Sequence, residues 1–121
     1  MNKTKLNLTM LLVSMIFIAC TVLDQEINVK DITKQDTLII KKHSDQDNVH
    51  GIKIKISGTI EGESRISLLL NKKDYKTKKL TGSFSFTWGG DWYSDSAKII
   101  YQPISAKNGD VIIQYYFKDI Y

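Results

Sequence analysis

Apolar and polar residues alternate along most of this chain, and that period of two constrains its fold more than any other feature. Successive side chains of a β-strand point to opposite faces of a sheet, so alternation marks a strand with one buried face. The segments that alternate or are rich in β-branched residues are 37–42, 52–57, 66–70, 75–80, 83–88, 97–101 and 111–117. None has a convincing helical period, so each is predicted to be a strand.

Turn signals separate these segments. They are Glu61-Gly62-Glu63-Ser64, Asn71 to Asp74, Thr81-Gly82, Gly89-Gly90-Asp91 and Asn108-Gly109. Glycine and asparagine tolerate the positive φ that tight turns require. Pro103 stands at the end of a predicted strand, where its missing N–H costs no central hydrogen bond. The sequence therefore predicts an all-β fold, a single antiparallel β-sandwich of about seven strands, with the aromatic rings of 83–88 and 111–117 buried between two sheets.

The first 19 residues have the features of an export signal. Residues 1–5 are short and positive, and residues 6–19 are apolar apart from three polar side chains. This is the pattern of a secretory signal peptide, which is removed from the mature protein. The alternatives are plain secretion and an uncleaved anchor, since residues 6–23 approach the length that spans a bilayer. The three polar side chains weaken such a spanning helix, so the signal is the preferred interpretation.

The sequence Phe17-Ile18-Ala19-Cys20 resembles the lipobox of bacterial lipoproteins, in which a small residue precedes a cysteine. The resemblance covers residues 1–20 only. It implies that residues 1–19 are cleaved off and that Cys20 carries a diacylglycerol and a further acyl chain such as palmitate. Two or more acyl chains hold a protein stably on a membrane. Thr21 follows the cysteine where many lipoproteins of the inner membrane have aspartate, so the resemblance implies the outer membrane.

The rest of the chain is long enough for one domain. Residues 20–36 are predicted to be a lipidated tether or a first strand, and residues 37–121 the sandwich. Cys20 is the only cysteine, so no disulfide can form within the chain and stability must come from packing. Lysine plus arginine number 17 against 13 aspartate plus glutamate, and two of the lysines fall in the signal. Such a small excess argues against nucleic acid as a partner.

The most unusual segment is 88–95, where three aromatic residues and two aspartates flank a glycine pair. Flat rings can stack on sugar rings while carboxylates accept hydrogen bonds from hydroxyls. The candidate ligand-binding residues are therefore Trp88, Asp91, Trp92, Tyr93 and Asp95. The alternative is that both tryptophans close one end of the core while the aspartates accept hydrogen bonds from loop amides.

Metal binding has weaker support. His43, Asp45, Asp47 and His50 are suitable ligands, but their spacing matches no metal signature and a polar loop explains them equally well. Calcium takes six to eight oxygens, and the 88–95 segment supplies only two carboxylates. We therefore expect no metal site and no cofactor.

A cluster of five lysines occupies residues 72–79. Its members are Lys72, Lys73, Lys76, Lys78 and Lys79. One interpretation is contact with anionic lipid headgroups or surface polysaccharide. The other is an edge strand whose lysines prevent sheets from pairing edge to edge.

Motifs of catalysis are absent from the sequence. It contains no nucleophile elbow, no HExxH and no phosphate-binding glycine motif, and Cys20 is committed to lipid. We expect no enzyme and no catalytic residue, but a lipid-anchored envelope protein that binds a protein or a polysaccharide. The alternative is an inhibitor or immunity-type lipoprotein. A hydrolase is a third possibility, and it requires His43 or His50 to converge with Asp91, Asp95 or a serine.

Overall fold

The computed structural model describes residues 25–119, and all regular structure in that range is β-strand. The strands are β1 (Gln25–Asn28), β2 (Asp36–Lys41), β3 (Val49–Leu70), β4 (Lys73–Asp91), β5 (Ser96–Pro103) and β6 (Asn108–Asp119). The predicted signal, 1–19, and Cys20 lie outside the described residues. Within the described range, no helix suitable for crossing a bilayer is found.

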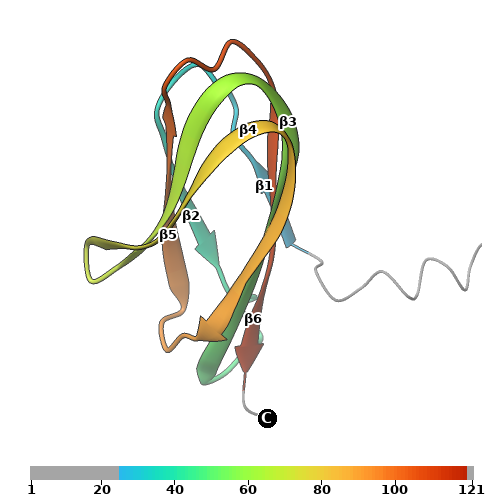
Figure 1. Ribbon diagram of the computed structural model, residues 1–121. Coiled ribbons are helices and arrows are strands. Elements are labelled where there is room, and N and C mark those ends of the chain that lie inside the picture. The colour runs from blue at the N-terminus through green and yellow to red at the C-terminus, as the bar shows by residue number, and fades with distance from the viewer. Residues whose placement is uncertain (1–24, 120–121) are drawn as a thin grey trace, which may run out of the picture.

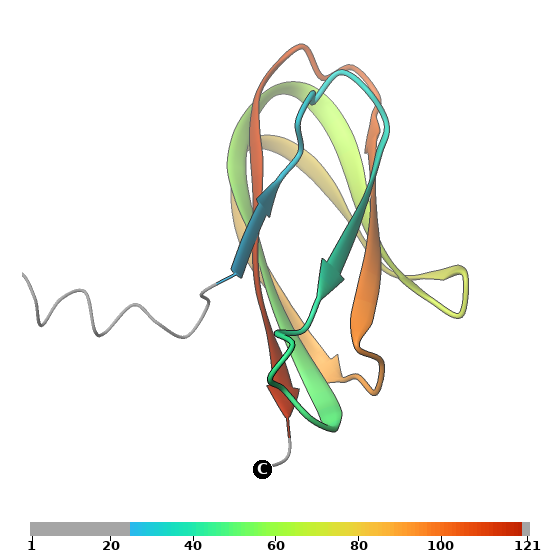
Figure 2. The same cartoon turned by 180° about the vertical axis from the view of Figure 1, so that it is seen from behind.

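The six strands form one antiparallel sheet that curls into two layers (Figure 1). Its order is β1-β6-β3-β5-β2, and β4 pairs with the other side of β3. The long strand β3 joins the layers, because residues 49–61 pair with β6 and residues 64–68 pair with β5. Seen from behind, β1 lies with β6 in one layer and β2 with β5 in the other (Figure 2). The predicted antiparallel β-sandwich is confirmed.

Two predicted turns are wrong, because the chain bends there without leaving its strand. The turns predicted at Gly89-Gly90-Asp91 and Asn108-Gly109 are displaced, since the first segment ends β4 and the second begins β6. Glu61-Gly62-Glu63-Ser64 lies inside β3 and Thr81-Gly82 inside β4, so four expected strands are two long ones. The pairing slips between Ile60 and Glu63, and Gly62 has φ +95° while Gly82, opposite Ile60, has φ +58°. Glycines at matching places on paired strands let both strands bend together.

Between residues 20 and 36, the structure shows a strand rather than a tether at Gln25–Asn28, which pairs with β6. Val29 and Ile32 follow it into the hydrophobic core. With this strand added and the two bent strands each counted once, the total is six. The fold therefore includes the first residues that the structure describes.

Both layers supply the core. Its fully buried side chains include Ile54, Ile56, Ile113 and Phe117 from one layer and Ile40, Ile66, Ile99 and Tyr101 from the other. Burying each such side chain contributes roughly 1.5–3 kcal/mol. The Tyr101 hydroxyl donates a hydrogen bond to the Ile32 carbonyl at 2.6 Å, so its one polar atom is satisfied.

The aromatic residues of β4 are less buried than the alternation predicts. Phe84, Phe86 and Trp88 pack against the core but keep part of their surface exposed. The reason is topological, since β4 has a partner on one side only. In β6, which lies between β1 and β3, Phe117 is fully buried.

Candidate ligand-binding site at the β4–β5 loop

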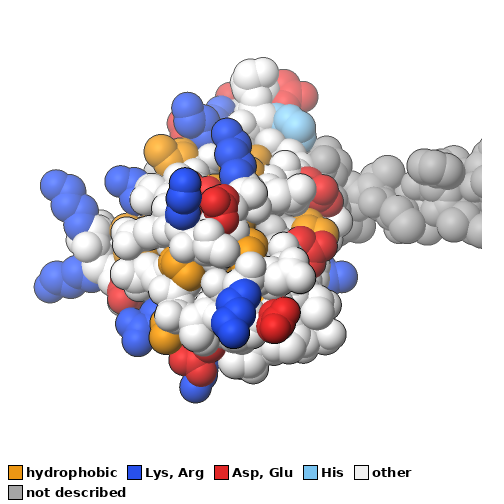
Figure 3. Space-filling model, turned by 90° about the horizontal axis from the view of Figure 1, so that it is seen from above, with side chains coloured by type: hydrophobic (Ala, Val, Ile, Leu, Met, Phe, Trp, Pro, Cys, Tyr) orange, Lys and Arg blue, Asp and Glu red, His pale blue; other side chains and the backbone are white. Residues whose placement is uncertain are grey.

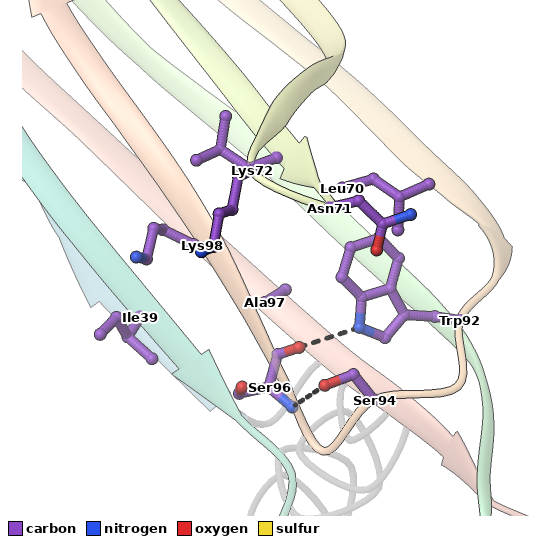
Figure 4. Close-up of a pocket in the computed structure, with 10 residues that line it drawn as sticks. Ile39, Leu70, Asn71, Lys72, Trp92, Ser94, Ser96, Ala97 and Lys98 are labelled. Carbon is purple, nitrogen blue, oxygen red and sulfur yellow. Dashed lines mark hydrogen bonds between the residues drawn. The ribbon is translucent and has the colours of Figure 1, made fainter.

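The loop that joins β4 to β5, residues 92–95, is fixed at both ends. Trp92 is only 6% exposed, and its indole Nε1 donates to the Ser96 carbonyl at 3.0 Å (Figure 4). Its backbone N–H donates to the His50 carbonyl at 3.1 Å, and the Lys42 N–H donates to the Asp95 carbonyl at 2.9 Å. The loop is therefore a supported element rather than a free excursion.

Tyr93, the residue after this buried tryptophan, is 77% exposed. A ring of this size exposed to solvent loses the stabilisation that burial would give it. Because Trp92 holds the loop, the position of Tyr93 is defined although its ring packs on nothing in the core. Such a ring is available to a ligand without reorganisation of the loop.

The five predicted site residues do not share one cavity. Trp88, Asp91 and Trp92 line a crevice that Tyr75 and Lys76 close, and its volume of about 10 Å³ is too small for a ligand. The Trp88 ring lies 5.4 Å from the Phe86 ring in a tilted arrangement. The tryptophans thus follow the structural alternative, in which they close one end of the core.

The two aspartates do not follow that alternative. Asp91 and Asp95 are exposed, and in the described part of the chain neither carboxylate accepts a hydrogen bond from a loop amide. Ser94 Oγ instead accepts a weak bond of 3.4 Å from the Ser96 N–H (Figure 4). Both carboxylates are therefore free to accept hydrogen bonds from an external group.

Tyr93 and Asp95 line an open hollow of about 580 Å³, which we call the Tyr93 hollow. The other lining residues come from the β2–β3 connection and the start of β3: Lys42, Asp47, Asn48, Val49 and His50. A volume of this size lies in the range of small-molecule sites, roughly 300–1,000 Å³. One aromatic ring, two carboxylates, an imidazole, an amide and an ammonium group therefore surround the same space.

The β2–β3 connection that forms the far wall is also anchored. Gln46 is buried, and its side-chain amide donates to the Phe117 carbonyl at 2.5 Å while its Oε1 accepts from the His43 N–H at 2.9 Å. Lys42 Nζ donates to the Gln46 carbonyl. These bonds tie the connection to β6, so both walls of the hollow are positioned by buried groups.

A second cavity of about 450 Å³, the hairpin pocket, lies on the other side of the β4–β5 loop. It opens where β3 runs past its last pair with β5, Leu68 with Ile99, into the β3–β4 hairpin. Figure 4 shows Trp92, Leu70 and Asn71 on one side of it and Lys72 and Lys98 on the other. The remaining lining residues are Ile39, Leu69, Ser94, Ser96 and Ala97.

The predicted lysine cluster occupies the hairpin and the first half of β4. Asn71 and Lys72 form its turn with φ of 52° and 66°. In the view from above (Figure 3), basic side chains project on the left, the side on which the β3–β4 hairpin lies in Figure 1. Lys79 pairs with Glu63 at 2.9 Å. The prediction that these lysines lie on an edge strand is confirmed, because β4 pairs only with β3.

The structure shows where the residues of the metal and hydrolase hypotheses lie. His50 and Asp95 do converge on the Tyr93 hollow, but no serine, threonine or cysteine is among its lining residues. Across residues 25–119, no three histidine, cysteine, aspartate or glutamate side chains come together as metal ligands. The hollow offers hydrogen-bonding groups and a ring, without an assembled nucleophile–base pair.

Comparison with solved structures finds distant likeness. No protein-family model matches the chain, and no curated protein matches its sequence. A structure described as "CBM4 structure and function" aligns over 78% of this chain and 72% of its own, with 13% identity and a TM-score of 0.44. The carbohydrate-binding module CBM36 in complex with calcium and xylotriose aligns over 75% of this chain and 78% of its own, with 9% identity and a TM-score of 0.36. The coat protein of tobacco streak virus aligns over 84% of this chain and 92% of its own, with 9% identity and a TM-score of 0.42. Likeness this distant assigns neither family nor ligand.

Proposed function

We propose that this chain is a non-catalytic binding module that holds a glycan against Tyr93 and is attached to a bacterial membrane through lipid on Cys20. The observation that carries the binding role is the ring of Tyr93, 77% exposed on a loop pinned by a buried tryptophan. A saccharide presents a face of C–H groups that packs on such a ring. The site is the Tyr93 hollow.

The polar lining of the hollow complements sugar hydroxyls. Asp47 and Asp95 accept hydrogen bonds, Lys42 donates them, and Asn48 and His50 can do both. A hydroxyl also donates and accepts, so a mixed set of this kind suits it better than an apolar group. Of the two ligand classes predicted from the sequence, protein and polysaccharide, the lining favours polysaccharide.

The membrane role rests on residues 1–20. Only four residues separate Cys20 from Gln25, where β1 begins. Even a fully extended connection of this length reaches no more than roughly 18 Å. A lipidated Cys20 would hold the sandwich close to the membrane surface, where it meets envelope polysaccharide.

The binding proposal is tested with the full chain carrying Cys20→Ser, applied to immobilised envelope polysaccharides. Tyr93→Ala should weaken retention at least about tenfold, because it removes the stacking ring. Leu70→Ala, which trims the hairpin pocket instead, is the matched control and should leave retention unchanged. Loss with Leu70→Ala alone would move the ligand to the hairpin pocket. Retention of no polysaccharide, or release of reducing sugars, would contradict glycan binding without catalysis.

The anchor is tested separately in a bacterium that expresses the full chain. Labelled palmitate should be incorporated into the protein, and Cys20→Ser should abolish incorporation and release the protein from the membrane fraction. Membrane retention of Cys20→Ser would favour an uncleaved helix instead of lipid.

A further inference from the structure

The longest free edge of the sheet is β4. Among the described strands, those that end the sheet are β1 and β2, of 4 and 6 residues, whereas β4 has 19 and pairs with β3 alone. An edge strand offers a row of unpaired N–H and C=O groups to any other strand. A free edge of this length therefore needs protection or a partner.

Charged side chains, which discourage pairing with another strand, lie along only one part of this edge. Four lysines lie between Lys73 and Lys79, whereas the ten residues from Thr81 to Gly90, TGSFSFTWGG, contain no charge and no proline. Charged side chains and proline are the usual means by which proteins prevent edge pairing. We call residues 81–90 the uncharged edge.

The backbone of the uncharged edge has no second partner in residues 25–119. Its hydrogen bonds run to β3, and the only further bond is between the side chains of Ser83 and Thr59, at 3.2 Å. Ser83, Ser85 and Thr87 are exposed on one face, and Phe84 and Phe86 are half-buried on the other. The stretch thus has the alternation of a strand inside a sheet but occupies an edge.

We propose that the uncharged edge pairs antiparallel with the same edge of a second copy of this chain. A two-fold axis perpendicular to the sheet keeps each side chain on its own face. Directly opposed residues must then be of the same parity, so the axis passes midway between the two copies of one residue. Placing it at Ser85 opposes Ser83 to Thr87 and Phe84 to Phe86 of the other copy.

This register also satisfies the charges that flank the uncharged edge. It matches Lys79 of one copy with Asp91 of the other at each end of the paired segment. An axis one residue later, at Phe86, would match Lys79 with Tyr93 instead. Opposite charges at the ends and none in between favour a second copy, since it brings no unpaired charge into the interface.

The register is tested by cysteine crosslinking in the full chain with Cys20→Ser, kept in mild detergent. Ser85→Cys should form a disulfide-linked dimer at least about tenfold faster than Ser83→Cys alone, because a disulfide requires Cα atoms within roughly 7 Å. Ser83→Cys should stay slow, because the two copies of residue 83 lie about 14 Å apart in this register. A mixture of Ser83→Cys and Thr87→Cys chains should crosslink as fast as Ser85→Cys.

The association itself is tested by sedimentation of the same chain. Ser85→Lys opposes two ammonium groups at the axis and should yield a monomer, whereas Thr37→Lys, which adds the same charge on β2, should leave the dimer intact. A monomeric parent chain would overturn the proposal. Equal crosslinking at residues 83 and 85 would overturn it too. Either result would leave glycan binding at Tyr93 unaffected, since that hollow lies outside the uncharged edge.

Discussion

The two halves of β4 share one backbone and one free edge, yet they close the molecule by different chemistry. In the first half, Lys76 and Lys78 stand opposite the buried Leu68 and Ile66, so they occupy positions on the inner face. In the second half the inner positions carry Phe84, Phe86 and Trp88. The strand therefore changes from lysine to aromatic where it bends between the layers.

The halves also meet each other. The Lys78 ammonium lies 5.6 Å from the centre of the Phe86 ring, across the opening between the two layers. Lysine stems can cover apolar surface while the charged end stays in water. Both halves of the edge strand thus cover the core, but the lysines also place charge along the edge, whereas the aromatic half leaves its edge uncharged.

The largest expected effect comes from removing the bend that separates the halves. A Cβ at Gly62 would lie 2.2 Å from the Ser105 carbonyl oxygen, and its φ of +95° disfavours other residues. Gly62→Ala should lower the free energy of unfolding by about 3 kcal/mol or more, measured by urea denaturation. Gly82→Ala is the control, because nothing lies within 4 Å of its Cβ position. It should cost only about 1 kcal/mol, from its φ of +58°.

The next prediction compares one inner side chain from each half. In urea denaturation, Phe86→Ala should lower the free energy of unfolding by about 2 kcal/mol, less than the loss of a fully buried ring would. Lys78→Ala should lower it by about 0.5 kcal/mol. The double variant should show a coupling of about 0.5 kcal/mol, the contribution of the ammonium–ring contact. Equal losses from the two single variants would mean that the halves do not differ in how they close the core.

Much of this fold could be predicted from local pattern. Alternation located every strand from β2 onward and placed Trp88 on the inner face, because side-chain direction is a local property. It failed at Gly62 and Gly82, since a glycine with positive φ suits a bend within a strand as well as a turn between strands. Alternation does not reveal which strand has a free edge, because that depends on long-range pairing. The lysine cluster at residues 72–79 indicated the edge instead.

The site shows the same limit. The 88–95 segment was predicted as the ligand loop from its composition, but not which ring is exposed. Trp92 is buried because its backbone pairs with His50, some 40 residues away in the chain. The same contact brings His50 towards Tyr93 and Asp95, a juxtaposition that spacing cannot reveal. The hairpin pocket was missed because its lining residues come from segments far apart in the sequence, at 39, 69–72, 92, 94 and 96–98.

A smaller effect on stability is expected from Tyr101, which lies in the layer that the first half of β4 belongs to. Burial raises the pKa of the Tyr101 hydroxyl, although the nearby Ser64 hydroxyl opposes the change. Ionisation is therefore easier in the unfolded chain. Stability should be intact below about pH 10, the ordinary tyrosine value, and fall as the pH rises above it. Tyr101→Phe should cost about 1 kcal/mol at pH 7 by loss of its bond to Ile32 and should flatten the alkaline decline. An unchanged decline would assign it to other groups.

The smallest effect on stability is expected from Lys79, the last lysine in the first half of β4. Lys79 forms an ion pair with Glu63, but its side chain is mostly exposed, and exposed pairs contribute about 0–1 kcal/mol. Lys79→Ser should therefore change the unfolding free energy by no more than about 0.5 kcal/mol. It should nevertheless increase self-association beyond the proposed dimer, because a longer uncharged edge can pair in other registers once Lys79 no longer matches Asp91. Light scattering of this variant against Lys34→Ser, which removes a lysine from the β1–β2 connection instead, separates the two roles. If both variants stay equally dispersed, lysine at this edge does not control pairing, and the contrast between the two halves of β4 is one of core covering alone.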